Sequence, residues 1–401
     1  MYRVSYHLIH FARALLAGVA VATLWVNLAP ASYYDAMEWR LFPLPFPDWL
    51  VPAHARVTLI SLTSEALMAL VYFLLAKELW EANTLERGAL HGRRGGLPLL
   101  ATLGACLGAV LVWLAVSTLV ETAEEARFGT GWALPIGADV MLCYLLGRRI
   151  LGAGSPALHM LLLITIGADL AGLAVQGLAF PDQPLRLVWL LLPLSASVMV
   201  WWLAGRHAGS TRESDRQRAL HLWPYALAGL VGGGGVLAAG LPGALGLLPV
   251  IPAIPHAERA FGLFAEAEEF LHDPLNRLAH LLVWPIVAVM FLFGLTHGGI
   301  DLAAFGPTTI TTLAAFWIGK PLGLLAGVWL AARLLGIALP PGIGWPQFGR
   351  IALLIGIGFT GPALALESAV PGGAMAEAAR MGLALSLLPA VVLAIRPFGR
   401  G

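Results

Sequence analysis

Three charged side chains lie in stretches of the chain that are otherwise apolar. Lys320 falls in a run from about Leu313 to Leu330, and Asp139 and Asp169 each follow small apolar residues. A charged group at the centre of a bilayer costs roughly 2.5–3.5 kcal/mol even on lenient insertion scales, so such groups face a protein interior and meet a partner. A membrane protein with two such carboxylates and one such ammonium is expected to move an ion.

The composition is that of an integral membrane protein. Of 401 residues, 59% are hydrophobic and 12% charged, with a mean hydropathy of +0.80, whereas soluble domains carry about 25% charged residues. The net charge of +1 gives no sign of the clustered basic surface that nucleic acid requires. Cys106 and Cys143 fall in apolar runs and predict no disulfide framework. No nucleophile–base pair or metal-ligand spacing occurs in a span, which favours a transporter without a cofactor over an intramembrane enzyme.

Twelve stretches of the chain are candidates to cross a membrane. Each is mainly apolar, and about 20 such residues are needed to cross a hydrocarbon core of about 30 Å. The first, within residues 1–31, is read as a transmembrane helix rather than a signal peptide because many spans follow it. Two candidates within 222–255 are so close that eleven spans fit equally well. The twelve are centred near Val21, Leu70, Val110, Val140, Leu170, Leu194, Leu230, Leu248, Val287, Leu324, Gly356 and Leu385.

Lys and Arg residues are distributed unevenly between the two sides that twelve spans create. With a cytoplasmic N-terminus, seventeen of the 24 fall on the cytoplasmic side, and five fall on the other, namely Arg40, Arg56, Arg127, Arg186 and Arg380. Cytoplasmic loops are enriched in these residues, and acidic residues contribute little to the rule. Both termini are therefore predicted to be cytoplasmic, in spite of the acidic segment 256–273.

Two of the predicted spans are interrupted. The fourth is broken at Pro135-Ile136-Gly137-Ala138, directly before Asp139, and the eleventh at 356–362, which includes Gly356, Gly358 and Thr360. Non-helical backbone at membrane depth is tolerated only where protein or a wet cavity surrounds it. A pair of interrupted helices in corresponding positions indicates a secondary transporter with inverted repeats, here spans three to five and ten to twelve.

Four motifs in the same order resemble those of the NhaA-type sodium/proton antiporter family. They are Ala66-Leu67-Met68-Ala69-Leu70 with Glu78; Gly131-Trp132-Ala133-Leu134-Pro135 followed by Ala138-Asp139; Gly319-Lys320-Pro321-Leu322-Gly323 with Trp329-Leu330-Ala331-Ala332-Arg333-Leu334; and Gly356-Ile357-Gly358-Phe359-Thr360. Together they cover nearly the whole chain.

The resemblance implies an all-α fold of twelve helices in which two broken helices cross at the midplane. A mobile ion-translocating bundle would comprise about 97–180 and 307–396, and an interface part about 1–96 and 185–300. The resemblance also implies a homodimer in the bacterial inner membrane that exports Na+ or Li+ in exchange for H+. The segment 32–56 matches the position of an extracytoplasmic hairpin used in dimer contacts, although the three prolines at 43, 45 and 47 argue against a regular central strand.

The chain departs from the family pattern at several positions. The first aspartate of the fifth-helix doublet is Ala168, the threonine before Asp139 is Ala138, and the Asn-Asp pair of the second helix is Ser64-Glu65. The histidine of the segment linked to pH response is absent from 240–244, and the Ala-Asn-Ala-Gly of helix nine has become 290–293.

Each charged residue has a functional and a structural interpretation. Asp169 is predicted to bind the cation when ionised and release it when protonated, with Thr165 and carbonyls near Gly137 as further ligands; otherwise it is protonated or paired with Lys320. Asp139 and Lys320 could instead offset the partial charges of half-helix ends. With one aspartate fewer, we expect reduced or absent electrogenicity.

The remaining polar residues carry weaker predictions. Glu65 and Glu78 are predicted to line a cytoplasmic funnel, although Glu65 could simply be a polar residue at a helix mouth, and Glu78 could lie with Lys77 at an interface. His272 and His297 are predicted to lie in loops. Two other functions stay open: a non-transporting relative that acts as a sensor or structural partner, and a transporter of another substrate, since Ala138 and Ala168 would widen and neutralise the pocket.

Overall fold

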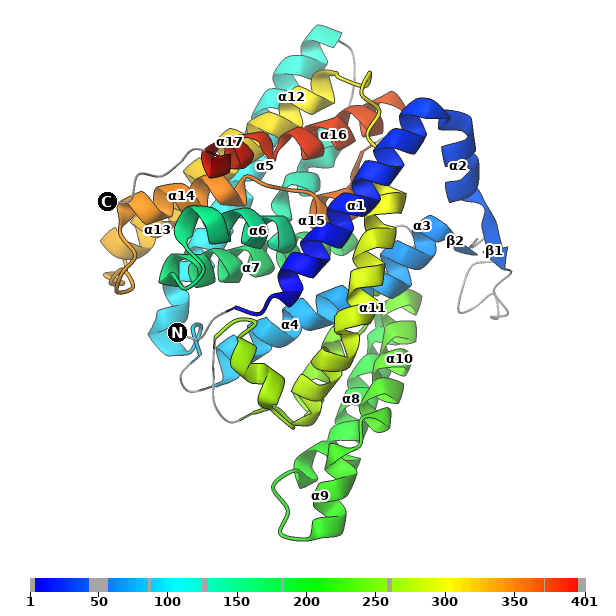
Figure 1. Cartoon of the computed structure of the whole chain (residues 1–401), viewed down its shortest axis with the longest axis vertical. Helices are drawn as coiled ribbons and strands as arrows, with labels where there is room; N and C mark the ends of the chain where they lie inside the picture. The colour runs from blue at the N-terminus through cyan, green and yellow to red at the C-terminus, as the bar shows by residue number, and fades with distance from the viewer. Residues whose placement is uncertain are drawn as a thin grey trace.

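The computed structural model describes residues 4–42, 57–85, 88–124, 129–181, 184–257, 262–370 and 372–395. These residues form a bundle of helices with one short pair of strands (Figure 1). The elements, with η for 3-10 and π-helical turns, are α1 (His7–Leu28), α2 (Pro30–Glu38), β1 (Arg40–Phe42), β2 (Val57–Thr58), α3 (Leu59–Ser61), η1 (Leu62–Leu67), α4 (Met68–Thr84), η2 (Gly92–Gly95), α5 (Gly96–Glu124), η3 (Gly129–Ile136), α6 (Val140–Leu151), α7 (Pro156–Ala179), η4 (Leu187–Leu190), α8 (Leu191–Leu203), η5 (Gly205–His207), α9 (Glu213–Leu220), α10 (Trp223–Ala238), η6 (Gly243–Leu245), η7 (Leu248–Ala253), η8 (Glu266–Phe270), α11 (Pro274–His297), α12 (Pro307–Ala314), η9 (Ala315–Gly319), α13 (Lys320–Arg333), α14 (Trp345–Ile355), α15 (Thr360–Ala369), α16 (Ala374–Leu385) and α17 (Leu388–Ile395).

The predicted multi-span organisation is confirmed. Within the described residues, eight helical segments are long and apolar enough to cross a membrane, and three bent pairs raise the number to eleven. The twelfth expected span corresponds to 243–253, which is too short and consists of 3-10 turns. Pro249 and Pro252 lack the amide hydrogen that an α-helix needs, which explains its irregular form.

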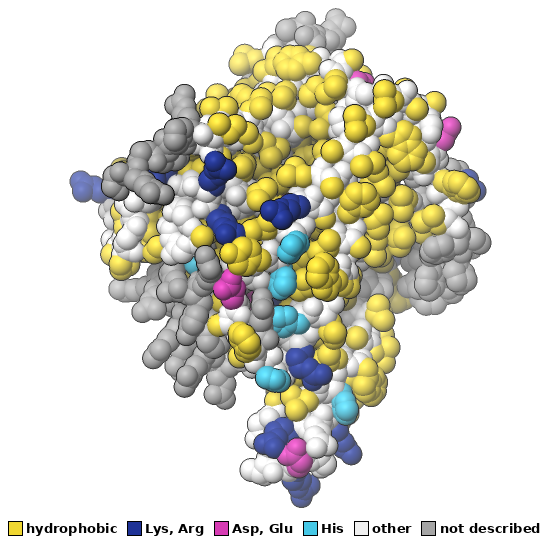
Figure 2. All heavy atoms as spheres, viewed as in Figure 1, with side chains coloured by type: hydrophobic (Ala, Val, Ile, Leu, Met, Phe, Trp, Pro, Cys, Tyr) yellow, Lys and Arg dark blue, Asp and Glu magenta, His cyan; other side chains and the backbone are white. Residues whose placement is uncertain are grey.

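Apolar side chains cover the outside of the bundle. Figure 2 shows them over the face formed by α1 and α11, where Leu24, Leu281 and Trp284 are each more than 60% exposed. Charged side chains gather around α9 at the bottom of the view and in a second group left of its centre. Because a soluble protein rarely exposes so large a continuous apolar surface, this face is suited to contact with lipid.

Both predicted interruptions are present. The segment Thr130–Ile136 and α6 meet at 45°, and α14 and α15 meet at 46°. Pro135 and the glycines at 137, 356 and 358 account for the breaks, because neither residue type supports a continued helix. A third bend of 45°, between α9 and α10, was not predicted; Pro224 at the start of α10 favours a new helix there.

Glycines let α5 and α13 pack backbone to backbone. A methyl group at Gly104 would lie 3.1 Å from the Cα of Gly327, and one at Gly108 would lie 2.7 Å from the Cα of Gly323. Glycines four residues apart form a small-residue stripe that allows membrane helices to approach closely. This contact explains the glycines at 319 and 323, which flank Lys320 in the sequence motif.

A short hairpin base follows α2. β1 and β2 pair antiparallel, with Arg40 opposite Thr58 and Phe42 opposite Val57. The pair lies at the edge of the bundle in Figure 1. The prolines at 43, 45 and 47 of the predicted hairpin, and residues 43–56 as a whole, lie outside the described residues.

Candidate functional site

Asp139 joins the two broken spans at their break. It caps α6, accepting a hydrogen bond from the Leu142 amide at 2.7 Å. Its second oxygen accepts from the Thr360 amide at 3.0 Å and from the Thr360 hydroxyl. Amides in the first turn of a helix have no partner within the helix, so one buried carboxylate serves two half-helix N-termini at once. The geometry matches the predicted structural role of Asp139 as an offset for helix-end charge.

Lys320 meets the opposite kind of helix end. Its Nζ donates a hydrogen bond to the carbonyl of Gly137, just after the half helix that ends at Ile136, and lies 4.3 Å from the centre of the Phe316 ring. A positive charge beside a helix C-terminus and over an aromatic face is favourable. Lys320 follows the π-helical turn η9 directly, and such turns occur often at functional sites.

Asp169 reaches the same break from α7. Its Oδ1 accepts a hydrogen bond from the Ala138 amide at 3.2 Å. A methyl group at Gly361 would overlap this oxygen, and one at Gly137 would lie 3.2 Å from it. The carboxylate is therefore enclosed by glycines of both broken spans, and only 1% of Asp169 is exposed.

The structure shows no direct ion pair between Lys320 and Asp169. Among the described residues, Lys320 has no carboxylate within 4.0 Å. Instead, Lys320 binds the oxygen and Asp169 the amide hydrogen of the peptide bond between Gly137 and Ala138. Each of the two charges therefore polarises the same peptide group, which couples them electrostatically.

The neighbouring positions of α7 differ in what they can contribute. Ala168 is fully buried and offers a methyl group only. Thr165, one turn before Asp169, donates its hydroxyl hydrogen to the Leu162 carbonyl at 3.0 Å, which leaves its oxygen able to accept or to coordinate.

Ser386 is a polar residue of the crossing that the sequence analysis missed. It lies between α16 and α17, and its Oγ accepts from the Gly358 amide at 3.2 Å. Its carbonyl accepts from the indole of Trp317 at 3.2 Å. Nothing in the local sequence marks this serine, since only the fold brings residue 386 beside the break at 358.

The structure does not bring Glu65 and Glu78 together. They lie thirteen residues apart on one helical span, which corresponds to about 20 Å along a helix. The Glu65 carboxylate accepts a hydrogen bond from the Gly243 amide. The two carboxylates therefore lie at different depths of that span, and their place in one cytoplasmic funnel stays a prediction.

Glu78 belongs to a buried cluster around Lys77. The Lys77 ammonium lies 2.9 Å from Glu78, 3.0 Å from Glu81 and 2.6 Å from Glu268. The Phe264 amide also donates to Glu78 at 2.6 Å. All four charged residues are buried, with at most 9% of each residue exposed. Burial, followed by the nearby charge of Glu78, raises the pKa of Glu268 to about 9.

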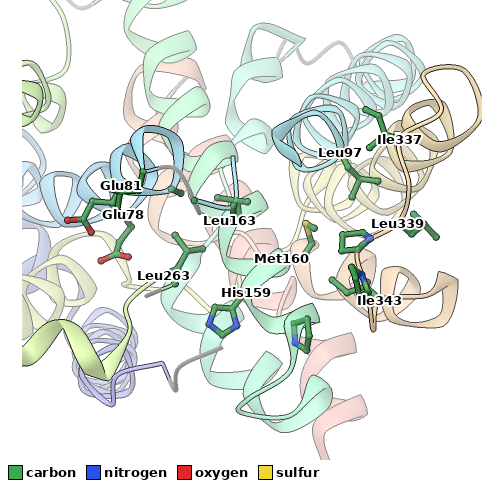
Figure 3. Close-up of a pocket in the computed structure, with 18 of the residues that line it drawn as sticks. Glu78, Glu81, Leu97, His159, Met160, Leu163, Leu263, Ile337, Leu339 and Ile343 are labelled. Carbon is green, nitrogen blue, oxygen red and sulfur yellow. The ribbon is translucent and has the colours of Figure 1, made fainter. Parts of the chain in front are cut away.

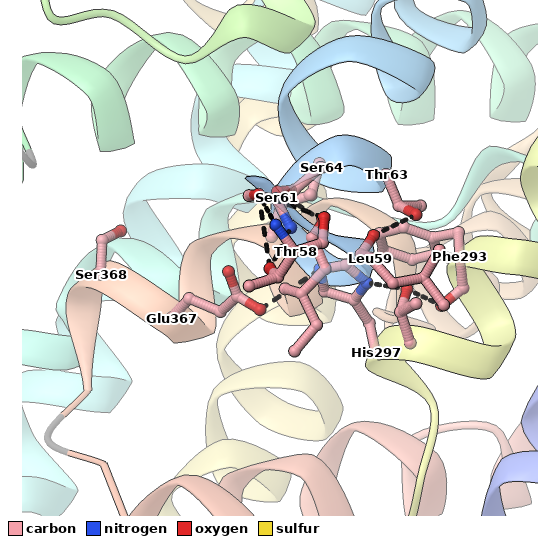
Figure 4. Close-up of polar contacts among 12 residues, drawn as sticks. Thr58, Leu59, Ser61, Thr63, Ser64, Phe293, His297, Glu367 and Ser368 are labelled. Atoms are coloured by element: carbon pink, nitrogen blue, oxygen red, sulfur yellow. Dashed lines mark hydrogen bonds and ion pairs between the residues drawn. The ribbon is translucent and has the colours of Figure 1, made fainter. Parts of the chain in front are cut away.

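His297 is not a loop residue, contrary to the sequence-based prediction. It ends α11, is 2% exposed and stacks on Phe293 with ring centres 4.4 Å apart. Its Nε2 lies 3.3 Å from Glu367 on α15 (Figure 4). The mainly apolar helix before it could have indicated burial. The loop prediction is confirmed for His272, which lies between η8 and α11.

Crossed half helices that share a buried carboxylate, within a multi-span bundle, define the class of secondary transporters built from interrupted helices. The family described as Na+/H+ antiporter 1 matches residues 9–396. The chain is 37% identical to the Na+/H+ antiporter NhaA of Jannaschia sp., over 98% of this chain and 96% of that protein. It is 33% identical to that of Geobacter sulfurreducens, over 87% and 85%. The chain belongs to the NhaA family.

A solved structure shares the fold. The sodium proton antiporter MjNhaP1 of Methanocaldococcus jannaschii aligns with a TM-score of 0.52 over 97% of this chain and 98% of its own, at 15% identity. Among the described residues, no group of three or more His, Cys, Asp and Glu is arranged to hold a metal ion.

Proposed function

We propose that this chain is a multi-pass antiporter that exchanges Na+ or Li+ for protons at Asp169. The observation that carries the proposal is the enclosure of this carboxylate by both broken spans. Sodium is a hard cation that prefers oxygen ligands. These ligands are the Asp169 carboxylate, the Thr165 hydroxyl and the carbonyl groups at the helix break near Gly137. Protonation of Asp169 removes the negative charge that holds the cation.

The Lys320 contact supports a particular exchange step. Lys320 occupies the Gly137 carbonyl, one of the oxygens that a bound cation would use. We infer that cation entry displaces the ammonium from this carbonyl, and that cation exit restores it. With Ala168 in place of a second carboxylate, fewer charges move per cycle, so exchange should depend little on membrane voltage.

The wider arrangement is proposed by analogy with the family. The bundle of about 97–180 and 307–396 would move against the rest of a homodimer in the bacterial inner membrane, with both termini cytoplasmic. The apolar exterior and the uneven distribution of Lys and Arg support this placement. The chemistry requires no bound cofactor, since Na+ and H+ are the transported substrates.

The test is exchange in proteoliposomes of the purified protein. Lumenal pH is followed after addition of Na+, Li+ or K+, with Asp169→Asn as the variant and Asp215→Asn in α9 as the matched control. Exchange by the wild type and the control, abolished in Asp169→Asn, would support the proposal. Repeating the assay at clamped voltages tests electrogenicity, and strong voltage dependence would contradict the proposed charge count.

A second function has one specific observation in its favour. Asp139 and Lys320 are both hydrogen-bonded to backbone groups beside the helix breaks. The crossing could therefore act as a static scaffold that transports no ion. No exchange by folded protein from neutral to alkaline pH would favour a sensor, a structural partner or a transporter of another substrate.

A further inference from the structure

A buried histidine and a glutamate form a contact between α11 and α15. The Nε2 of His297 lies 3.3 Å from the Oε1 of Glu367, and Figure 4 shows both side chains below Thr58 and Ser61. In the proposed transport cycle, α15 belongs to the bundle that moves, and α11 belongs to the part against which it moves. The contact therefore crosses the boundary between the two parts.

The His297 ring is fixed on two other sides. It stacks on Phe293, and its Nδ1 lies 2.7 Å from the hydroxyl oxygen of Thr296. The hydroxyl hydrogen goes to the Leu292 carbonyl at 2.9 Å, which assigns Nδ1 as a donor to the hydroxyl oxygen. In its imidazolium form the ring then directs its second hydrogen from Nε2 toward the carboxylate of Glu367.

α15 connects this contact to the crossing. The helix is ten residues long and begins at Thr360, whose amide donates to Asp139. Its second residue is Gly361, where an added methyl group would overlap the Asp169 carboxylate. Glu367 lies seven residues after Thr360, about 10 Å along the helix. Because so short a helix moves as a unit, whatever holds its Glu367 end also positions the crossing.

Gln176 of α7 holds the same end of α15 from within the bundle. Its Nε2 donates to the Leu364 carbonyl at 3.0 Å and to the Ser368 hydroxyl at 2.9 Å. Both α7 and α15 belong to the proposed bundle, so this contact persists when the bundle moves. The contact of His297 with Glu367 crosses the boundary, so the same movement must break it.

A cavity of about 790 Å³ lies between the two parts at their other end. In Figure 3, Glu78 and Glu81 of α4 lie at one side, Ile337 and Leu339 at the other, and His159 of α7 between them. With both termini cytoplasmic, as proposed, α4 ends and α7 begins on the cytoplasmic side, where the cavity lies. A gap at one end and a contact at the other correspond to one state of an alternating-access cycle.

We propose that His297 is a positioning residue of this cycle: through Glu367 it holds the crossing in the state that is closed on the extracytoplasmic side. The proposal rests on the proposed antiport function and names a contact that this function must break. Loss of the contact destabilises that state alone, so the population shifts toward the other state. Na+ at the cytoplasmic face then meets fewer competent molecules, and the apparent KM rises although the site itself is unchanged.

The first measurement is hydrogen–deuterium exchange of the full-length protein in detergent, which requires no transport. His297→Phe keeps an aromatic ring on Phe293 and should exchange the amides of 293–297 and 364–369 at least about threefold faster. His297→Gln keeps a donor for Glu367 and should restore most of the protection. His272→Phe, the same substitution at an exposed histidine outside the contact, should match the wild type.

The second measurement is Na+-dependent proton exchange in everted membrane vesicles, in which the cytoplasmic face is outside. His297→Phe should raise the KM for Na+ at least about threefold, while kcat stays the same or increases. Glu367→Met should have the same effect. Because both substitutions remove one contact, the double variant should be no worse than either single variant.

Three results would overturn the proposal. They are deuterium uptake in His297→Phe equal to that of the wild type, a lower kcat with unchanged KM, which indicates a structural role alone, and effects that add in the double variant. If His297→Phe does not fold, Glu367→Met provides the same comparisons. Absence of exchange by the wild type would contradict the proposed function, and deuterium uptake would still decide whether this contact holds the two parts together.

Discussion

Lys320 and Asp169 bind opposite ends of one peptide bond, with Lys320 on the Gly137 carbonyl and Asp169 on the Ala138 amide. A peptide group is planar and strongly dipolar, so this arrangement stabilises both charges without bringing them into contact. A change of charge at Asp169 is therefore felt at Lys320. This relationship replaces the direct pairing considered from the sequence.

Replacing Lys320 tests this peptide link. In Lys320→Met the Gly137 carbonyl loses its donor, and an unsatisfied buried polar group costs about 1–3 kcal/mol. We expect a lower thermal unfolding midpoint in detergent, with Lys320→Arg less affected because it keeps a donor. A Met variant as stable as the wild type would show that the carbonyl does not depend on Lys320.

Asp139 should act mainly through its hydrogen bonds to the two half helices. Asp139→Ala removes both caps, at about 1–2 kcal/mol each, whereas Asp139→Asn keeps an acceptor oxygen and should cost less. Thr360→Val removes only the hydroxyl donor and should cost about 1 kcal/mol. The unfolding midpoints of the three variants provide the comparison. Equal losses for Asn and Ala would indicate that the charge, not the hydrogen bonds, matters.

Gly361 should be essential to the position of the Asp169 carboxylate. A methyl group at Gly361 overlaps Oδ1, so Gly361→Ala must displace Asp169 by a fraction of an ångström or more. Because small displacements of a reacting group are costly, exchange should fall by at least about tenfold. Gly349→Ala, in α14 with open space around the added methyl, is the matched control. Normal exchange in Gly361→Ala would argue against Asp169 as the exchange site.

The raised pKa of Glu268 predicts how stability changes with pH. Between the ordinary glutamate pKa of 4.5 and the folded value of about 9, the folded state binds more protons than the unfolded state. Stability should therefore fall as the pH rises through this window. Glu268→Gln cannot ionise, so its unfolding midpoint should fall less between pH 6 and about 9. An identical pH dependence in the variant would contradict the assignment.

Apolar periodicity and the distribution of prolines and glycines determined much of the fold. The spans, both breaks, and the burial of Asp139, Asp169 and Lys320 were predictable because lipid imposes its requirements on each segment separately. Only the tertiary structure decided the partners: Ser386 beside Gly358, His297 beside Glu367, Glu268 beside Lys77, and one peptide between Lys320 and Asp169. These contacts join residues far apart in the chain, and local sequence holds no information on which of them meet.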